Sequence, residues 1–326
     1  MNTAKATFQV AADTLAPWRD DVLTGTPPIL YPVGAGELSR LEVGPGLVSL
    51  FGGAPGAGKT AFTMQLAVDV LRMTPGLRAL VCNVEMPPPI LLDRQLARLS
   101  GVSLTAIRYR RLGAAEADRI DQGLHTLEAI ADRLGFVRPP FTLANVAACA
   151  DEFRAGLIVL DYIQRIAPPG EHGDKRGSVN ATMDYLRQFA DAGVAVIVVS
   201  AVGRTKDAKG RSSYAGDGLN LASFRESSEL EFGCDDAFIL HPADDDAEGD
   251  MMRLRHLKSR HGEQCDLWLT FNRSIQRFTP TAPPPAKSDR SPRRAASRAN
   301  PSVPTSALRA LWGRTEAASD DKGGDA

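Results

Sequence analysis

The order of apolar and polar positions along the chain predicts buried strands that alternate with amphipathic helices. Four short runs are almost wholly apolar, as is typical of strands covered on both faces: residues 47–51, 78–84, 157–160 and 194–200. Apolar residues recur at helical spacing in the segments between and after them: residues 61–71, 88–99, 103–110, 114–134, 142–154 and 178–192. This alternation predicts an α/β fold, with a mainly parallel twisted sheet flanked by helices.

Both ends of the chain depart from that pattern. Residues 1–40 precede the first strand and carry Phe8, Ala11, Ala12 and Leu15 on one face of a short helix, which Pro17 is expected to end; residues 24–36 are typical of a linker. A single short helix cannot bury its apolar face alone, so we expect it to pack on this domain or on a neighbouring subunit. Near residues 236–241, 251–258 and 266–271, shorter strands joined by polar turns predict an antiparallel C-terminal hairpin.

From residue 280 the composition shifts to proline, alanine, serine and arginine, which cannot form a core and predicts disorder. Leu308, Leu311 and Trp312 lie on one face of a possible short helix in this tail. That face could dock on a protein partner or nucleic acid, or the tail could be solvated without a specific partner. We therefore expect an extension (1–40), an α/β domain (41–279) and a disordered tail (280–326).

Composition narrows the class of protein. The 326 residues are 43% hydrophobic, which is ample for one large core, and the net charge of −1 leaves nucleic-acid binding to local patches. The four cysteines are far apart without a C-x-x-C pair, so we expect small core residues in a reducing compartment rather than a zinc site. No signal peptide is evident, and the longest apolar run (194–202) is too short for a bilayer. These features predict a cytoplasmic protein with no membrane partner.

A phosphate-binding loop of the form G-x-x-x-x-G-K-[ST] follows the first apolar run and precedes a helix. Its two fixed glycines allow backbone conformations and a close approach to phosphate that a Cβ would obstruct. Backbone N–H groups and the helix N-terminus then cradle the β-phosphate, Lys59 bridges the β- and γ-phosphates, and Thr60 holds Mg²⁺. The predicted ATP- and Mg²⁺-binding residues here are Gly53, Ala54, Pro55, Gly56, Ala57, Gly58, Lys59, Thr60 and Ala61.

Two carboxylates follow predicted strands. Asp161 ends an apolar run, as does the Mg²⁺-ordering acid of phosphate-loop ATPases. The carboxyl ends of parallel strands meet at one edge, so we expect Asp161 to meet the loop there. Glu85 would lie at the same edge if its strand is adjacent, where it could orient and polarise the attacking water. Alternatively, Glu85 is an acid favoured by the positive end of the next helix.

Five segments, in this order, resemble one family: GAPGAGKTAFTMQLA, NVEMPPPILLDRQLARLSGV, LIVLDYIQ, FRESSELEFGCDDAFIL and LKSRHGEQCDLWLTFN. The family is the C-terminal ATPase domain of DnaB-type replicative DNA helicases, and the resemblance covers roughly residues 30–279. It implies a RecA-like phosphate-loop fold, ATP hydrolysis, a homo-hexameric ring and contact with single-stranded DNA. Only residues 1–40 precede the predicted core, so we do not expect this chain to contain the family's helical N-terminal domain with its collar and primase-docking surface.

The resemblance also implies roles for single residues. Glu85 matches the catalytic carboxylate and Asp161 the Mg²⁺-ordering acid, while Gln164 lies in a nucleotide-site segment that couples nucleotide state to DNA. Lys258 and Arg260 match a basic pair that reaches the γ-phosphate of the adjacent subunit; without the resemblance they would be two exposed strand residues. Supplied in trans, such a guanidinium stabilises transition-state charge and makes hydrolysis depend on assembly.

Further positions follow from the same resemblance. Two glycine-rich basic loops are expected to track a DNA backbone without reading its sequence, and their basic residues are Lys175, Arg176, Arg204, Lys206, Lys209 and Arg211. Arg225 and Glu226 are expected to be structural or interface residues. The acidic run 244–250 is expected to be a solvated turn, and the sequence does not favour a metal site formed by His256, His261 and Cys265.

One position departs from the family pattern. Ser200 is followed by Ala201, where the family has glutamine, so an amide that could sense the γ-phosphate is missing and coupling of hydrolysis to DNA movement is in question. Two hypotheses remain: a DnaB-like helicase or translocase, and a RecA- or KaiC-like ATPase that binds DNA or a partner without unwinding. A small-molecule kinase has little support, since nothing suggests a lid or an acceptor pocket.

Overall fold

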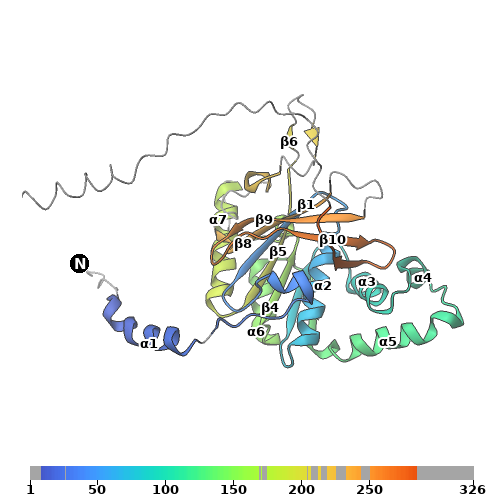
Figure 1. The fold of residues 1–326 in the computed structure, drawn as a ribbon, viewed down its shortest axis with the longest axis horizontal. Helices are drawn as coiled ribbons and strands as arrows, with labels where there is room; N and C mark the ends of the chain where they lie inside the picture. The colour runs from blue at the N-terminus through green and yellow to red at the C-terminus, as the bar shows by residue number, and fades with distance from the viewer. Residues whose placement is uncertain are drawn as a thin grey trace, which may run out of the picture. The chain divides into compact units, whose positions relative to one another are not determined.

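The computed structural model describes residues 9–25, 27–168, 170, 175–203, 205–206, 212–213, 219–224, 233–243 and 250–284 (Figure 1). Its centre is a sheet with the strand order β11-β10-β9-β8-β1-β5-β4-β2-β3. The strands are β1 (Val48–Gly53), β2 (Ala79–Asn83), β3 (Leu134–Phe136), β4 (Leu157–Asp161), β5 (Ala195–Ala201), β8 (Asp236–Pro242), β9 (Met251–Ser259), β10 (Leu267–Asn272) and β11 (Arg277–Pro280).

The sheet is mainly parallel, as the apolar runs predicted. The strands from β8 to β3 pair in parallel, whereas β9, β10 and β11 form an antiparallel meander at one edge. The meander contains one strand more than the sequence predicted, because β11 has only four residues and half of them are polar. The predicted fold class is confirmed.

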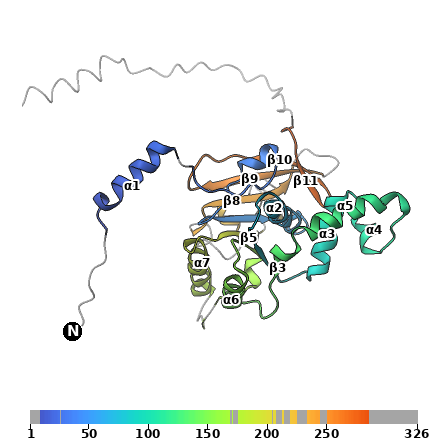
Figure 2. The ribbon, with the colours of Figure 1, turned by 90° about the horizontal axis from the view of Figure 1, so that it is seen from below.

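Both faces of the sheet are covered, which explains why its central strands are continuously apolar. Along β1, Leu50 packs into one core and Phe51 into the other. Helix α2 (Lys59–Met73) and a 3-10 helix (Gly36–Arg40) contribute to the Phe51 side. Helices α6 (Leu143–Phe153) and α7 (Lys175–Asp191) cover the Leu50 side (Figure 2).

Helices α3 (Pro88–Ser100), α4 (Leu104–Arg108) and α5 (Ala117–Glu128) enclose a small separate core of Ala97, Val102, Ile107 and Ile120. The single helix predicted over 114–134 is wrong: α5 is flanked by 3-10 helices at Ala114–Glu116 and Ala131–Arg133. The helix ends because Ile130 turns into the main core and Leu134 begins β3, which pairs with β2. Further 3-10 helices occupy Ile163–Arg165 and Leu221–Ser223, and β6 (Thr205–Lys206) pairs with β7 (Ser212–Ser213) in a separate ribbon.

Helix α1 (Ala11–Thr24) continues through Pro17, so the prediction that this proline ends the helix is wrong. A proline inside a helix removes one backbone hydrogen bond and crowds the carbonyl of the preceding turn, yet α1 ends only at Gly25, which has a φ of 68° and donates its N–H to the Asp21 carbonyl oxygen. No residue of α1 is buried, and Leu15, Trp18 and Val22 are 56–60% exposed. Packing of this helix on its own domain is therefore not observed; Phe8 lies outside the described residues.

The predicted linker is partly packed. Val33 belongs to the main core, and the Tyr31 N–H donates to the Val43 carbonyl oxygen at 2.6 Å. The structure describes the tail only as far as residue 284, so Leu308, Leu311 and Trp312 lie outside it. Within the described chain, no helix is both long and apolar enough to cross a bilayer.

The cysteines are all free. Cys82 and Cys234 are buried, and burial raises the pKa of their thiols to about 12 and about 11, so these two are unreactive core residues as the sequence predicted. Cys149 and Cys265 are partly exposed. No grouping of histidine, cysteine, aspartate or glutamate suited to a metal ion occurs among the residues with described positions.

Candidate functional site

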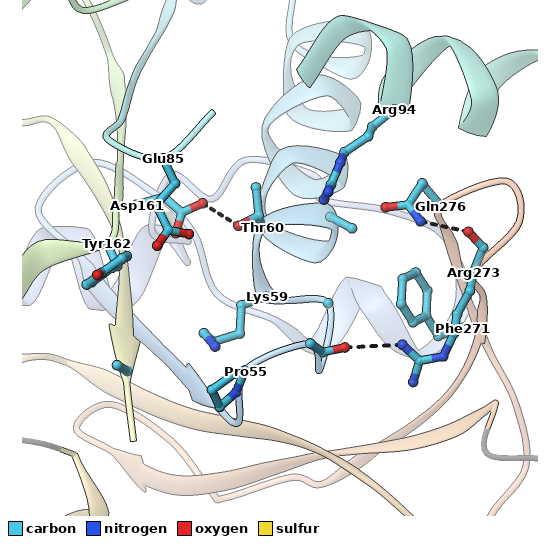
Figure 3. A pocket seen from close by; sticks show the side chains of 14 residues that line it. Pro55, Lys59, Thr60, Glu85, Arg94, Asp161, Tyr162, Phe271, Arg273 and Gln276 are labelled. Atoms are coloured by element: carbon cyan, nitrogen blue, oxygen red, sulfur yellow. Dashed lines mark hydrogen bonds between the residues drawn. The ribbon is translucent and has the colours of Figure 1, made fainter. Parts of the chain in front are cut away.

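A cleft of about 590 Å³ opens at the carboxyl ends of the parallel strands, around the phosphate loop (Figure 3). The loop and the start of α2 form one side, and the ends of β2, β4 and β5 form another. Helix α3 and the turn between β10 and β11 complete the wall. Its lining residues are Pro55, Gly56, Gly58, Lys59, Thr60, Ala61, Glu85, Arg94, Asp161, Tyr162, Ala201, Phe271, Arg273 and Gln276.

The two fixed glycines of the loop are required by space as well as by conformation. Gly58 caps α2 with a φ of 91°, and a Cβ there would lie 2.8 Å from the rings of Phe271 and Phe278. A Cβ on Gly53 would lie 2.6 Å from the Leu240 carbonyl oxygen. These glycines bring the loop against the neighbouring strands, and the N-terminus of α2 opens into the cleft, where its N–H groups favour an anion.

Lys59 supplies positive charge next to that helix end. Its ammonium group donates hydrogen bonds to the carbonyl oxygens of Gly53 at 2.7 Å and Ala54 at 3.0 Å. Burial lowers the pKa of Lys59, while the nearby charges of Asp161 and Glu85 oppose that shift. The loop thus keeps a partly desolvated cation beside two carboxylates.

Asp161 lies at the end of β4, within reach of the loop. Its Oδ2 accepts hydrogen bonds from Thr60 Oγ1 at 2.6 Å and from Asn83 Nδ2 at 2.7 Å. Burial raises the pKa of this carboxyl group, against the hydrogen bond from Thr60 and the charge of Lys59. A hydroxyl and a carboxylate this close are oxygen donors of the kind that Mg²⁺ prefers, so the two residues fit the predicted ion.

Glu85 reaches the same edge because β2 pairs with β4, Asn83 lying opposite Asp161. The Asn83 side-chain oxygen accepts the N–H groups of Glu85 at 3.0 Å and Met86 at 2.7 Å, which turns the chain so that Glu85 lines the cleft near Asp161 (Figure 3). Helix α3 begins only at Pro88 and has no acidic residue in its first turn. The alternative role for Glu85, an acid at the helix N-terminus, therefore has no support.

Some lining residues were not predicted from the sequence. The Arg94 side chain extends from α3 into the cleft (Figure 3), and its Nε is buried without a hydrogen-bond partner among the described residues. Burial lowers the pKa of Arg94, and the charge of Asp161 opposes this. In the β10–β11 turn, Arg273 Nη1 donates to the Gly56 carbonyl oxygen at 3.1 Å, and its guanidinium carbon lies 4.9 Å from the centre of the Phe271 ring. Helical spacing identified α3 but not the direction of Arg94.

Gly53, Ala54 and Ala57 of the predicted loop are not among the lining residues, and three further predicted site residues lie away from the cleft walls. Gln164 donates from Nε2 to Ser200 Oγ at 2.6 Å and accepts the Ala201 N–H at 3.2 Å, so its amide joins the ends of β4 and β5 behind the lining residues. Lys258 and Arg260 lie where β9 ends, beside the first residues of β8 and β1. Since β1 has six residues, this edge is roughly 17 Å from the loop at about 3.3 Å per residue.

The structure describes only some of the predicted DNA-contacting residues. Lys175 and Arg176 begin α7, so the prediction that they lie in a loop is wrong: the helix starts earlier than the apolar spacing from residue 178 indicated. Lys206 lies in β6 and pairs with Ser212 in β7. Outside the described residues lie Arg204, Lys209, Arg211, Arg225, Glu226 and positions 244–249 of the acidic run.

Comparisons with known proteins agree with this architecture. The model of the family "DnaB-like helicase C terminal domain" matches residues 42–280. A replicative DNA helicase DnaB from Treponema pallidum (strain Nichols) is 24% identical over 248 residues, which are 72% of this chain and 52% of that protein. The chain thus spans about half the length of this curated relative.

Two solved structures share the fold. One, described as an ATPase domain, matches with a TM-score of 0.71 at 16% identity, over 85% of this chain and 100% of that one. A DnaB-like replicative helicase, solved in a study of its interactions with primase, matches with a TM-score of 0.70 at 17% identity, over 85% and 68%. With the family model covering most of the chain, we conclude that the chain belongs to the DnaB-like helicase C-terminal domain family.

Proposed function

We propose that this chain hydrolyses ATP as the motor domain of a DnaB-like DNA helicase or translocase. The observation that carries the proposal is the convergence of Lys59, Thr60, Asp161 and Glu85 on one cleft at the carboxyl ends of the strands. Charge to hold phosphate, oxygen donors for Mg²⁺ and a carboxylate for water are the groups that ATP hydrolysis requires. The proposal extends to a motor domain of residues 41–279 between an extension and a tail, and to a cytoplasmic location.

The chain's residues divide the chemistry among them. The loop N–H groups and Lys59 bind the β- and γ-phosphates, and Arg94 adds a second cation from α3. Thr60 and Asp161 would hold Mg²⁺, which when bound neutralises charge on the phosphate oxygens. Glu85 orients a water molecule and accepts its proton as the water attacks the γ-phosphate, while the bond from the γ-phosphorus to the bridging oxygen breaks and ADP leaves. Burial of Asp161 and Lys59 strengthens these electrostatic interactions relative to water.

Lys258 and Arg260 are proposed to act on the nucleotide of a neighbouring subunit. They lie at the sheet edge opposite the loop, so neither side chain can serve its own cleft. A ring of subunits would place this edge against the next cleft, and the exposed apolar face of α1 is suited to contact with a neighbouring subunit. The hexameric ring is the family's expected assembly and is proposed for this chain on that ground.

Single-stranded DNA is the proposed nucleic-acid partner. The proposed contacts are the basic positions after β4 and β5, namely Lys175, Arg176, Arg204, Lys206, Lys209 and Arg211. The relative solved in a study with primase extends beyond the segment that this chain matches. Ala201 lines the cleft where the family has glutamine, which favours a second candidate, an ATPase that binds DNA or a protein without unwinding it.

Two assays distinguish the candidates. ATPase rates should be measured with and without single-stranded DNA, and strand displacement on a forked duplex with a 5′ single-stranded tail. A helicase shows both stimulation and displacement, with the Lys59→Ala variant as the inactive control. Stimulated hydrolysis without displacement would establish the second candidate, and absence of hydrolysis would overturn the proposal.

Catalysis between subunits has its own test. Arg260→Ala should hydrolyse ATP poorly alone and recover on mixing with Lys59→Ala, because Arg260→Ala clefts then meet intact Arg260 side chains. Arg255→Ala is the matched control, since Arg255 lies on β9, the strand that Arg260 follows, and donates to the Leu219 carbonyl oxygen at 3.0 Å. Normal hydrolysis by Arg260→Ala would show that the trans role is wrong.

A further inference from the structure

Asp235 is a buried carboxylate at the sheet edge opposite the cleft, and the sequence did not single it out. Its side chain is only 2% exposed and lies immediately before β8. It accepts hydrogen bonds from three different elements: the Val48 N–H at the start of β1, Arg187 Nη1 of α7, and Arg260 Nη1 beyond β9, each at 2.8 Å. A buried carboxylate with two arginine partners is held in one orientation, unlike a solvated surface acid.

The contacts divide between the two oxygens of Asp235. Oδ2 accepts Val48 and Arg187, and Oδ1 accepts Arg260. The backbone repeats the pairing with Arg260, because the Arg260 N–H donates to the Asp235 carbonyl oxygen at 2.9 Å. Lys258 Nζ donates to the carbonyl oxygen of the preceding residue, Cys234, at 2.8 Å. Residues 234 and 235 therefore hold both members of the basic pair.

This arrangement orients a side chain that would otherwise be mobile. An arginine carries about 2 kcal/mol of rotamer entropy, and its five N–H donors lie in one plane. The hydrogen bond from Nη1 to a buried carboxylate restricts the orientation of the guanidinium, while the Arg260 side chain remains 40% exposed. The guanidinium is thus held in a defined direction at the surface before any phosphate is present, which lowers the entropy lost when it engages one.

The same carboxylate is joined to the chain's own phosphate loop. Val48 begins β1 and Gly53 ends it, where the loop starts. β1 is hydrogen-bonded to β5 on one side and to β8 on the other along its length. The donor to Asp235 and the start of the loop are therefore the two ends of one strand that is held on both sides.

We propose that Asp235 is a positioning residue, which aims Arg260 at the nucleotide of a neighbouring subunit. The proposal rests on the proposed trans role of Arg260. Each subunit then carries its own ATP site at one end of β1 and the group that completes the next site at the other end.

The test is Asp235→Asn in the full chain, with Asp236→Asn as the matched control. Asp236 is the next residue and is 3% exposed, but its Oδ1 bonds to His256 Nε2 at 2.9 Å and does not contact Arg260. The amide of Asp235→Asn would present an NH₂ group to one of the donors that the carboxylate now accepts. We expect kcat of Asp235→Asn to fall on the order of 10- to 100-fold, as for a catalytic group displaced by about 1 Å. KM for ATP should stay within about twofold, because the variant's own cleft is intact. Asp236→Asn should keep the kcat of the unmodified chain.

Mixing separates positioning from folding. Asp235→Asn mixed with Lys59→Ala should recover activity, since its clefts then meet correctly held Arg260 side chains. An equal fall in Asp236→Asn, a fall that mixing does not rescue, or an unchanged kcat would each overturn the positioning role. If Asp235→Asn does not fold, Arg187→Gln decides: a reduced kcat that mixing restores supports the role, and an unchanged kcat overturns it. Failure of Arg260→Ala to recover with Lys59→Ala would instead overturn the trans function itself.

Discussion

Glu85→Gln tests the chemical step most directly, because the structure predicts a large effect on hydrolysis and almost none on folding. The Glu85 side chain is exposed in the cleft, and the turn that orients it depends on its backbone N–H and Asn83. The substitution leaves that turn in place, so we expect the free energy of unfolding to change by less than about 0.5 kcal/mol. The amide has nearly the shape of the carboxylate but cannot accept a proton.

The expected loss follows from the role of a general base. Such a group contributes about 10²- to 10⁴-fold to a rate. Its loss therefore raises the activation barrier by roughly 3 to 5 kcal/mol. Binding should not weaken, since the substitution removes a negative charge from a cleft that receives phosphates. Removing that charge also lowers the pKa of Asp161, because Glu85 is one of the charges that raise it.

The assay is ATP turnover at saturating nucleotide, with nucleotide affinity measured separately by a fluorescent analogue. Glu128→Gln serves as the control, because Glu128 is an exposed acid of α5 that does not line the cleft. We expect Glu85→Gln to bind nucleotide at least as tightly as the unmodified chain and to turn it over at least 100-fold more slowly. Turnover within about threefold of the unmodified chain would refute the assignment of Glu85 as the base.

Three further predictions concern the same cleft. Gly58→Ala combines a left-handed conformation (about 1–2 kcal/mol) with overpacking against two rings (about 1–3 kcal/mol). Denaturant unfolding should therefore show that the free energy of unfolding falls by about 2 to 5 kcal/mol. Gly56→Ala, with open space around its Cβ, should lose no more than about 2 kcal/mol. Arg94→Ala should raise KM for ATP about 10- to 100-fold, the equivalent of one charge-assisted hydrogen bond, and an unchanged KM would exclude Arg94 from phosphate binding. The raised pKa of Asp161 means that the folded state binds its proton more readily than the unfolded chain, so the ionised carboxylate lowers stability as pH rises past its ordinary pKa. Asp161→Asn should therefore raise the Tm of the nucleotide-free protein at neutral pH while abolishing Mg²⁺-dependent turnover. A lower Tm would contradict the predicted direction of this stability change.

The sequence predicted those parts of the cleft that depend on local pattern. The loop spacing and the acid at the end of an apolar run identified Lys59, Thr60 and Asp161 without knowledge of the topology. Glu85 needed one further condition, that its strand lies beside β4, and the sheet order satisfies it. The residues that were missed come from elements whose orientation no periodicity specifies: Arg94 depends on the rotation of α3, and the β10–β11 turn depends on a four-residue strand.

The errors in element boundaries have different causes. Pro17 was expected to stop a helix, but α1 continues through it and ends at a left-handed glycine instead. Lys175 and Arg176 were assigned to a loop because the apolar spacing begins at residue 178, although α7 starts at Lys175. Polar first turns carry no hydrophobic signal, so helix starts of this kind are not visible in the pattern.

Ala201 bears on whether ATP hydrolysis in this chain is coupled to movement along DNA. The residue lines the cleft with a methyl group only, yet its backbone N–H is bonded to Gln164, whose amide also bonds Ser200. Gln164 follows Asp161 by three residues, so its amide connects the chain segment after Asp161 to the end of β5 without a side chain at position 201. Because the basic segment proposed to contact DNA follows β5 directly, we expect this connection between the cleft and that segment to remain. Stimulation of hydrolysis by DNA without strand displacement would agree with a connection through Gln164 that needs no side chain at position 201.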